Sequence, residues 1–257
     1  MKVGLIQHDI VWEDAAATRE HVRPMIAKAA AEGARVIVLS EMFATGFSMF
    51  PERIAEDEGG GSEQFLREQA AEHDAYLIGS LAQRGPDEAY RNNAVVAAPD
   101  GTVRRYAKIH PFGYAHEDEH YLAGSDYLTV EVDSLRMSVF VCYDLRFADE
   151  FWVRAEQTDA YVVVANWPQA RSAHWRVLLQ ARAIENQAYV IAVNRVGTAD
   201  GLVYQGDSAI VDPLGRYVAE CPVGESVMVG EIDAATVSHT RRTLPFLRDR
   251  RPVLPRG

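Results

Sequence analysis

The segment MSVFVCYDLRFADEFWVRA, residues 137–155, contains the change of pattern that decides the fold. Its first five residues are mostly apolar, which predicts a buried strand. Phe147 and Phe151 then recur one helical turn apart, which favours a helix that begins soon after Cys142. A strand, a sharp turn and a helix therefore present the Cys142 thiol at a sheet edge. There the positive end of the helix dipole favours the thiolate, although a lone cysteine is more often a small buried apolar residue.

Similar apolar runs recur along the chain and predict strands that are covered on both faces. These runs are VGLI (3–6), VIVL (36–39), AYLIGSL (75–81), NAVVA (93–97), YVVVA (161–165), YVIAV (189–193) and SAIV (208–211). Helical patterns separate several of them, at 15–33 and at 172–188, where Ser172 is a candidate N-cap. Turn signals at 98–102 and 212–216 indicate hairpins. We therefore expect an α/β fold of mixed sheets with helices outside.

The chain has the composition of an ordinary globular protein, and its 257 residues fit one large domain. We expect a single domain over 1–257, ending in a basic, proline-containing arm over 241–257 that lies on its own surface or on a neighbouring subunit. The formal net charge of −11 disfavours nucleic acid as a partner. The first residues lack the apolar stretch of a signal peptide, and no run is long enough to span a membrane. The two cysteines are far apart, which favours free thiols and a cytoplasmic location.

Two charged residues occupy the same kind of position as Cys142. Glu41 follows the apolar run RVIVLS, and Lys108 follows the extended segment TVRRYA. Sites in α/β folds usually lie where strands reach the edge of a sheet. Taken alone, Glu41 fits a surface acid or a helix cap, and Lys108 fits a solvated lysine. The combination of carboxylate, ammonium and thiol in such positions points instead to one site.

These three segments closely resemble the nitrilase superfamily of carbon-nitrogen hydrolases. The matching stretches are VIVLSEMFATGF, YAKIHPF and VFVCYDLRFADEF, and the order Glu, Lys, Cys is that of the superfamily. The later stretches ANWPQARSAHW and ARAIENQAYVIAVNRVG resemble its omega-amidase branch. The resemblance implies a four-layer αββα sandwich and a homodimer. It also implies an amidase that releases ammonia from a small linear amide, with a dicarboxylate monoamide such as 2-oxoglutaramate as the expected substrate. A nitrilase or another small-amide hydrolase is the second interpretation.

Chemistry and resemblance together give each catalytic group a role. Glu41 is the expected general base, Cys142 the nucleophile, and Lys108 with the backbone N–H of Tyr143 the expected oxyanion donors. The resemblance also implies a second glutamate after the lysine. Glu117 is the better match and Glu119 is the other candidate. No metal or organic cofactor is expected.

A substrate that carries a carboxylate calls for a cation in an otherwise apolar pocket. Arg171 is the candidate cation, and Phe47, Tyr114 and Trp167 are the candidate walls. We interpret Arg146 as a structural residue that pairs with a nearby acid such as Glu150. Arg146 is therefore left out of the expected site.

A different class of enzyme is suggested by the sequence HEDEH, residues 116–120, which satisfies the H-E-x-x-H pattern of zinc hydrolases. In that interpretation His116 and His120 bind zinc and Glu117 is the base. The pattern is short, and Pro111, Gly113 and Gly124 restrict any helix to about two turns. A solvated acidic loop is a simpler explanation than zinc, and the resemblance to the nitrilase superfamily gives Glu117 the different role described above.

Overall fold

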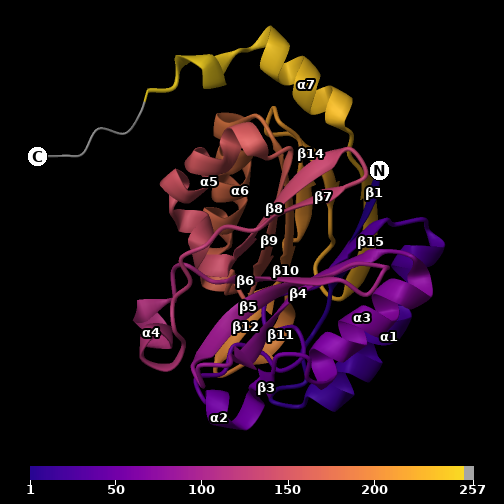
Figure 1. Ribbon diagram of the computed structural model, residues 1–257, viewed down its shortest axis with the longest axis vertical. Helices are drawn as coiled ribbons and strands as arrows, with labels where there is room; N and C mark the ends of the chain where they lie inside the picture. The colour runs from indigo at the N-terminus through magenta and orange to yellow at the C-terminus, as the bar shows by residue number, and fades with distance from the viewer. Residues whose placement is uncertain (252–257) are drawn as a thin grey trace, which may run out of the picture.

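Two β-sheets face each other in this computed structural model, which describes residues 1–251 (Figure 1). The first sheet has the order β15-β1-β2-β4-β5-β6, with β3 beside β4. Its strands are β1 (Lys2–Gln7), β2 (Val36–Val38), β3 (Glu56–Asp57), β4 (Tyr76–Arg84), β5 (Tyr90–Ala97), β6 (Val103–Ala107) and β15 (Ser226–Glu231). The second sheet has the order β14-β13-β10-β9-β8-β7. Its strands are β7 (Thr129–Val132), β8 (Leu135–Val141), β9 (Ala160–Ala165), β10 (Tyr189–Asn194), β13 (Ala209–Val211) and β14 (Tyr217–Glu220).

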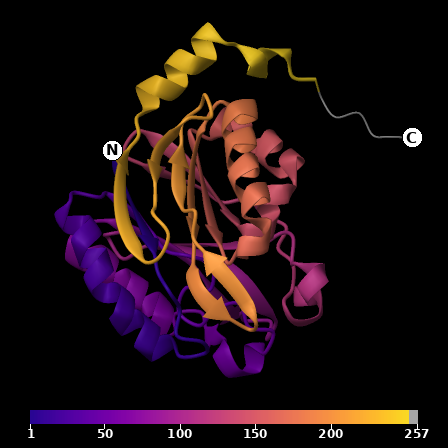
Figure 2. The same cartoon turned by 180° about the vertical axis from the view of Figure 1, so that it is seen from behind.

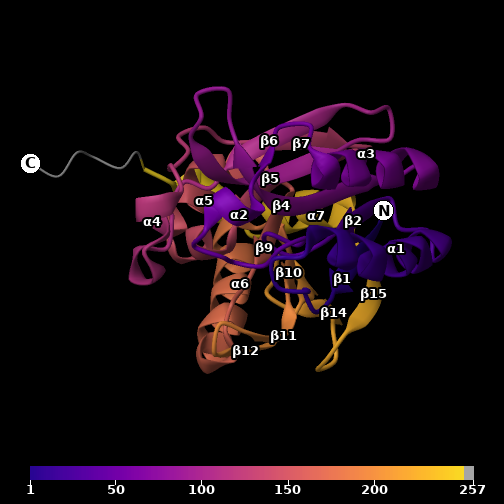
Figure 3. The same cartoon turned by 90° about the horizontal axis from the view of Figure 1, so that it is seen from below.

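Helices cover the outer faces of both sheets. On the first sheet, α1 (Ala15–Ala31) and α3 (Gly61–His73) lie side by side, as the view from below shows (Figure 3). On the second sheet, α5 (Ala148–Arg154) and α6 (Ser172–Asn186) lie on the opposite side of the molecule (Figure 1). The expected α/β class and four-layer αββα sandwich are confirmed. The remaining helices are α2 (Pro51–Ile54), α4 (Glu117–His120), α7 (Ala234–Thr243), η1 (Gly113–Ala115), η2 (Cys142–Arg146), η3 (Ala155–Gln157), η4 (Gln169–Arg171) and η5 (Phe246–Asp249).

The predicted apolar runs all form strands because each is enclosed by two layers. Every residue of β9 and of β10 is buried, between the first sheet on one face and helix α6 on the other. Leu5 of β1 and Val139 of β8 belong to the apolar cluster between the sheets. Ile26 of α1 and Phe65 of α3 pack in a second cluster on the outer face of the first sheet. Because each sheet buries apolar side chains on both faces, it is covered by the other sheet on one side and by helices on the other.

Strand direction determines which side chains meet at an edge. In the first sheet β2 and β4 are parallel, and β6 has the same direction because β4–β5 and β5–β6 are both antiparallel pairs. In the second sheet β8 and β9 are parallel. The residues that follow β2 and β6 therefore share one edge, and those that follow β8 and β9 share another.

Two local expectations need correction. Ser172 is not the N-cap of α6, because Arg171 occupies that position and the Ser172 hydroxyl donates to Asp207 Oδ2 at 2.5 Å. The arm was expected to begin at residue 241, but helix α7 continues to Thr243. Arg241 on this helix donates hydrogen bonds to the carbonyl oxygens of Thr158 and Gln187, so this part of the chain packs against its own second sheet. The last residues of the expected arm, 252–257, lie outside the described residues.

A hairpin projects beyond the second sheet at the end that carries the site. It consists of β11 (Val196–Ala199) and β12 (Leu202–Gln205), which pair antiparallel (Figure 2). Among residues 1–251, no helix combines the length and apolar character needed to cross a bilayer.

Candidate active site

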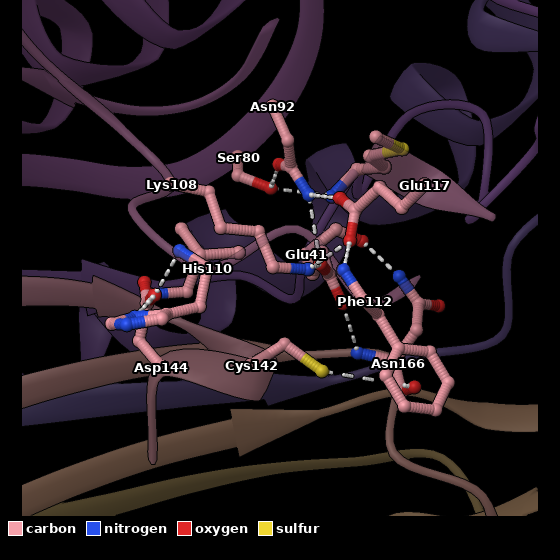
Figure 4. Close-up of polar contacts among 12 residues, drawn as sticks. Glu41, Ser80, Asn92, Lys108, His110, Phe112, Glu117, Cys142, Asp144 and Asn166 are labelled. Carbon is pink, nitrogen blue, oxygen red and sulfur yellow. Dashed lines mark hydrogen bonds and ion pairs between the residues drawn. The ribbon is translucent and has the colours of Figure 1, made fainter. Parts of the chain in front are cut away.

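Glu41, Lys108 and Cys142 converge from three strand ends (Figure 4). Glu41 follows β2, Lys108 directly follows β6, and Cys142 directly follows β8. The first two come from one sheet and the third from the other, so the cluster lies where the edges of the two sheets meet. The spatial expectation from the sequence, that these groups share one site, agrees with this geometry.

The Lys108 ammonium is held between two carboxylates. Lys108 Nζ lies 2.9 Å from Glu41 Oε1 and 2.7 Å from Glu117 Oε2. All three side chains are buried. Burial alone would lower the pKa of Lys108, but the charges of Glu117 and Glu41 more than offset it and hold this pKa above its usual value. Lys108 is therefore a permanent cation beside the thiol.

The structure distinguishes between the two candidate glutamates in the loop after Lys108. Glu117 is fully buried and also accepts a hydrogen bond from the Phe112 backbone N–H. Glu119 is exposed and pairs with His116 instead. Burial raises the pKa of the Glu117 carboxyl, and the Lys108 charge opposes that shift. Of the two candidates, Glu117 is therefore the one that lies in the buried cluster with Lys108.

Asn92 and Ser80 support the two carboxylates, and sequence reasoning missed both. Asn92 Nδ2 donates to Glu41 Oε1 at 2.8 Å and to Glu117 Oε1 at 3.1 Å. Ser80 Oγ donates to Asn92 Oδ1 and accepts from the backbone N–H of Met42, both at 2.8 Å. Ser80 interrupts an apolar buried strand, and that exception to the pattern is a signal that could have identified it. Asn92 stands in the polar start of β5, beside Arg91 and Asn93, where no such exception marks it.

Cys142 occupies a strained turn at the floor of a cavity. Its φ is 45°, its exposed fraction is 9%, and Sγ lies 4.0 Å from the carbonyl oxygen of Asn166. Asn166 also contacts the base, because its backbone N–H donates to Glu41 Oε2 at 2.8 Å. A residue with positive φ stores backbone strain that persists only where the surroundings enforce it. The turn therefore presents the sulfur toward the cavity and the Glu41 carboxylate.

Burial and the neighbouring Glu41 charge oppose the thiolate that the sequence pattern was expected to favour through a helix dipole. The chain after β8 first forms the five-residue 3-10 helix η2, and α5 begins only at Ala148. Burial raises the pKa of the Cys142 thiol well above its usual range, and the Glu41 charge acts in the same direction. The Lys108 charge only partly opposes this. Attack by Cys142 consequently requires a base that removes the proton.

Asp144 holds the turn that carries Cys142. This buried carboxylate accepts hydrogen bonds from the backbone N–H groups of Val141 (3.0 Å) and His110 (2.9 Å), and from the Tyr106 hydroxyl (2.8 Å). On the other side, Arg182 of α6 donates to the Leu145 carbonyl oxygen at 2.8 and 3.1 Å. These bonds hold the backbone after Cys142 from two directions.

A cavity of about 210 Å³ opens over the sulfur. Its lining includes Cys142, Tyr143 and the expected substrate residues Phe47, Trp167 and Arg171. Tyr114 is not part of the lining. Its side chain is 85% exposed, because η1 turns it outward, and Phe112 takes its place at the wall.

Arg146 also lines the cavity, contrary to the expectation that it pairs with Glu150. Its guanidinium lies 4.6 Å from the centre of the Trp167 ring. Glu150 instead accepts a hydrogen bond from the Tyr127 hydroxyl at 2.5 Å and lies 3.5 Å from His110 Nε2. Because Arg146 ends η2 whereas Glu150 belongs to α5, the two side chains point to different surroundings. Arg146 is thus a residue of the site that sequence reasoning left out.

The zinc interpretation does not fit the geometry of residues 116–120. Helix α4 has only four residues, and His116 precedes it in a left-handed conformation. His116 is exposed, whereas the Glu117 carboxylate faces Lys108 in the interior. In the part of the chain that the structure describes, no three His, Cys, Asp or Glu side chains are grouped in a way that could hold a metal ion.

The four-layer fold and the Glu–Lys–Cys cluster together define the class that the sequence resembled, the nitrilase superfamily. A family model described as carbon-nitrogen hydrolase matches residues 2–242, and the chain belongs to this family. It is 42% identical to the omega-amidase YafV of Yersinia enterocolitica, over 97% of this chain and 96% of that protein. It is 34% identical to a 2-oxoglutaramate amidase of Bacillus subtilis, over 86% of both chains.

Solved structures agree with the fold. A CN-hydrolase superfamily protein from Xanthomonas campestris, crystallised with an arsenic adduct in its active site, is 35% identical with a TM-score of 0.94. That alignment covers 99% of this chain and 98% of the other.

Proposed function

We propose that this protein is an omega-amidase, which hydrolyses the amide end of a short dicarboxylate monoamide such as 2-oxoglutaramate to a carboxylate and ammonia. The observation that carries the proposal is the buried Glu41–Lys108–Glu117 cluster beside the Cys142 thiol in one small cavity. The names of the similar omega-amidase and 2-oxoglutaramate amidase support the substrate class. A cavity of about 210 Å³ suits a small linear substrate.

In the first step Glu41 takes the proton of Cys142 as the sulfur attacks the amide carbon. Because burial raises the pKa of the thiol, the attack needs a base, and Glu41 is placed to supply it. The carbonyl oxygen becomes an oxyanion, which the Lys108 ammonium and the Tyr143 backbone N–H stabilise. Fixed donors in a site from which water is largely excluded stabilise such a charge strongly.

In the second step Glu41 returns the proton to the amide nitrogen, the carbon–nitrogen bond breaks, and ammonia leaves. A thioester remains on Cys142. The same carboxylate then removes a proton from water, which attacks the thioester carbon and releases the acid and the thiol. Glu117 and Asn92 position the Lys108 ammonium and the Glu41 carboxylate through both half-reactions. No step needs a cofactor.

At the other end of the substrate, Arg171 is the proposed partner of the carboxylate, while Phe47 and Trp167 contact the aliphatic chain. An apolar wall with a few placed polar groups is typical of such pockets. Arg171 lies 5.4 Å from the centre of the Phe112 ring, and its carbonyl oxygen accepts a hydrogen bond from Trp167 Nε1 at 2.8 Å.

We propose a homodimer and a reducing, cytoplasmic setting as well. Val177 and Ile184 of α6, together with Val153 of α5, are exposed apolar side chains on the outer layer, a suitable surface for a second copy. Both cysteines are free thiols. The solution mass, measured by light scattering, tests the dimer: a monomer mass would contradict it.

The function is tested by ammonia release from 2-oxoglutaramate, other small amides and nitriles. We expect 2-oxoglutaramate and related monoamides to have the highest kcat/KM. Preferential turnover of nitriles would favour a nitrilase instead. Activity that is lost with a chelator but resists iodoacetamide would contradict the thiol mechanism.

A further inference from the structure

Tyr204 is a buried tyrosine whose hydroxyl group makes no hydrogen bond within residues 1–251. The residue is 6% exposed and lines the cavity that contains the Cys142 sulfur. The hydroxyl groups of three other buried tyrosines, Tyr106, Tyr121 and Tyr161, each donate a hydrogen bond to a protein oxygen at 2.7–2.8 Å. Because buried polar groups normally have such partners, the Tyr204 hydroxyl is available to a molecule in the cavity.

A buried cation holds the ring of Tyr204 in place. The Arg195 guanidinium lies 4.8 Å from the ring centre, and Arg195 is fully buried. Arg195 in turn donates hydrogen bonds to Asp9 Oδ1 at 2.6 Å and to the Val196 carbonyl oxygen at 3.0 Å. A cation on the face of an aromatic ring fixes the ring and leaves the hydroxyl at its edge free.

Gly197 makes this arrangement possible. It pairs with Tyr204 across the β11–β12 hairpin, and its φ is 93°. A Cβ at this position would lie 2.1 Å from Asp9 Oδ1, so a larger residue would displace the carboxylate that holds Arg195. The hairpin and the segment after β1 therefore act together to set the position of the Tyr204 ring.

The Tyr204 hydroxyl lies within electrostatic range of the catalytic groups and stays protonated. Burial raises the pKa of Tyr204 to about 12, and the Arg195 charge opposes this shift. Negative charge on Cys142 and on Glu41 raises the pKa further. At neutral pH the group is thus an uncharged hydroxyl, which can accept a hydrogen bond as well as donate one.

The second half-reaction needs a water molecule that is held for attack on the thioester. Glu41 Oε1 already accepts hydrogen bonds from Lys108 and Asn92, and Oε2 accepts one from the Asn166 backbone N–H. The contact with Glu41 fixes one hydrogen of the water, whereas an ordered water usually has about three polar partners. A second acceptor on the cavity wall would orient the water so that its lone pair faces the thioester carbon.

We propose that Tyr204 is a catalytic residue of the second half-reaction, in which its hydroxyl oxygen accepts one hydrogen of the attacking water; this inference rests on the proposed amidase function. The water donates its other hydrogen to Glu41, which takes that proton as the water oxygen forms a bond to the thioester carbon. The carbon–sulfur bond then breaks, the proton on Glu41 passes to the Cys142 sulfur, and the acid leaves. Tyr204 keeps its own proton throughout.

The test separates formation of the thioester from its hydrolysis with the 4-nitrophenyl monoester of glutarate. A fast burst of 4-nitrophenolate reports acylation of Cys142, and the slower steady release reports hydrolysis of the thioester. Tyr204→Phe keeps the ring and removes the hydroxyl. We expect an unchanged burst and a steady phase that is about 10-fold slower, the order expected for loss of one uncharged hydrogen bond. Intact mass of quenched samples should show the Cys142 thioester persisting longer after the ester is consumed than in the wild type.

Tyr217→Phe is the matched control. Tyr217 also has an arginine over its ring, Arg176 at 5.1 Å, but it does not line the cavity. Both kinetic phases of this variant should equal those of the wild type. Thermal unfolding of each variant verifies that the fold is kept.

A steady phase of Tyr204→Phe equal to that of the wild type would overturn the role of Tyr204. A burst that slows as much as the steady phase would also overturn it, because the hydroxyl would then act on the substrate and not on the water. A wild type that gives neither a burst nor an acyl group on Cys142 would instead contradict the proposed function itself. The failures are therefore distinguishable.

Discussion

Asn166 makes two hydrogen bonds to Glu41, a residue 125 positions earlier in the sequence: its backbone N–H donates to Glu41 Oε2 at 2.8 Å and its Nδ2 to the Glu41 carbonyl oxygen at 2.6 Å. Glu41 follows a strand of the first sheet and Asn166 follows β9 of the second. Glu41 is thus held by both sheets. The Cys142 sulfur lies 4.0 Å from the carbonyl oxygen of the same asparagine, so Asn166 contacts both Glu41 and Cys142.

Replacement of the base should remove most of the activity without unfolding the protein. Glu41→Gln keeps the shape of the side chain but cannot accept the thiol proton. We expect kcat to fall by about 100-fold to 10,000-fold, the range for loss of a general base. Steady-state ammonia release measures this. An activity within a few-fold of the wild type would exclude Glu41 as the base.

Replacement of Lys108 should affect stability as well as activity. Lys108→Met leaves the carboxylates of Glu41 and Glu117 buried without a cation, and breaking a buried pair in this way typically costs about 3–5 kcal/mol. Urea unfolding of Lys108→Met should show this loss. Adding Glu117→Gln to the same variant should restore part of the stability, whereas activity should remain low because the oxyanion donor is missing. A double variant no more stable than the single one would contradict the charge argument.

Asn92 should act through position and not through direct chemistry. Asn92→Ala removes one donor from each of the two glutamates, and we expect about a 10-fold to 100-fold loss in kcat with little change in KM. Asn92→Asp replaces the donor with a third carboxylate beside Glu41 and Glu117, and its kcat should fall further than that of Asn92→Ala. The separate measurement of kcat and KM checks this. A variant that loses only substrate affinity would show that Asn92 has a different role.

The pH dependence of stability should report on His110. The hydrogen bond to Asp144 raises the pKa of His110 above its usual value of 6.5, burial opposes this, and the Asp144 charge adds to it. A group whose pKa is higher in the folded state stabilises the fold fully below its unfolded pKa, and that contribution is lost as the pH rises through the folded value. The free energy of unfolding should therefore fall as the pH rises above about 6.5.

His110→Gln is the matched variant for this experiment, since it removes the titrating group. Urea unfolding at several pH values should give a flatter profile above pH 6.5 for His110→Gln than for the wild type. Identical slopes in the two proteins would mean that His110 contributes nothing to the pH dependence.

Much of the fold could be predicted because its strands are enclosed on both faces. Runs such as 161–165 and 189–193 have no polar position, and a strand is the compact way to bury them. Strand β15 was missed because its apolar run is only three residues long, Val227 to Val229, and stands between Ser226 and the polar end at Glu231. Helix α3, which begins at Gly61 just after a glycine-rich turn, was missed because its start resembles a loop.

The core of the site was easiest to predict, because its residues lie at strand ends, while the predictions for loop residues were correct for some (Phe47, Arg171) and wrong for others. Glu41, Lys108 and Cys142 have that position in the sequence pattern, whereas the direction of a loop side chain depends on contacts made elsewhere. Tyr114 was wrongly assigned to the wall, because the turn at η1 exposes it. Arg146 was wrongly paired, because the turn after Cys142 directs it toward Trp167.

The most direct test of the account is the covalent intermediate on Cys142. The protein is mixed with 2-oxoglutaramate, quenched with acid within the first turnovers, and examined by intact mass and peptide mapping. The account predicts an adduct equal to the substrate less ammonia on the peptide that contains Cys142, and neither adduct nor turnover in Cys142→Ala. Sustained ammonia release by Cys142→Ala, or an acyl group on another residue, would contradict it.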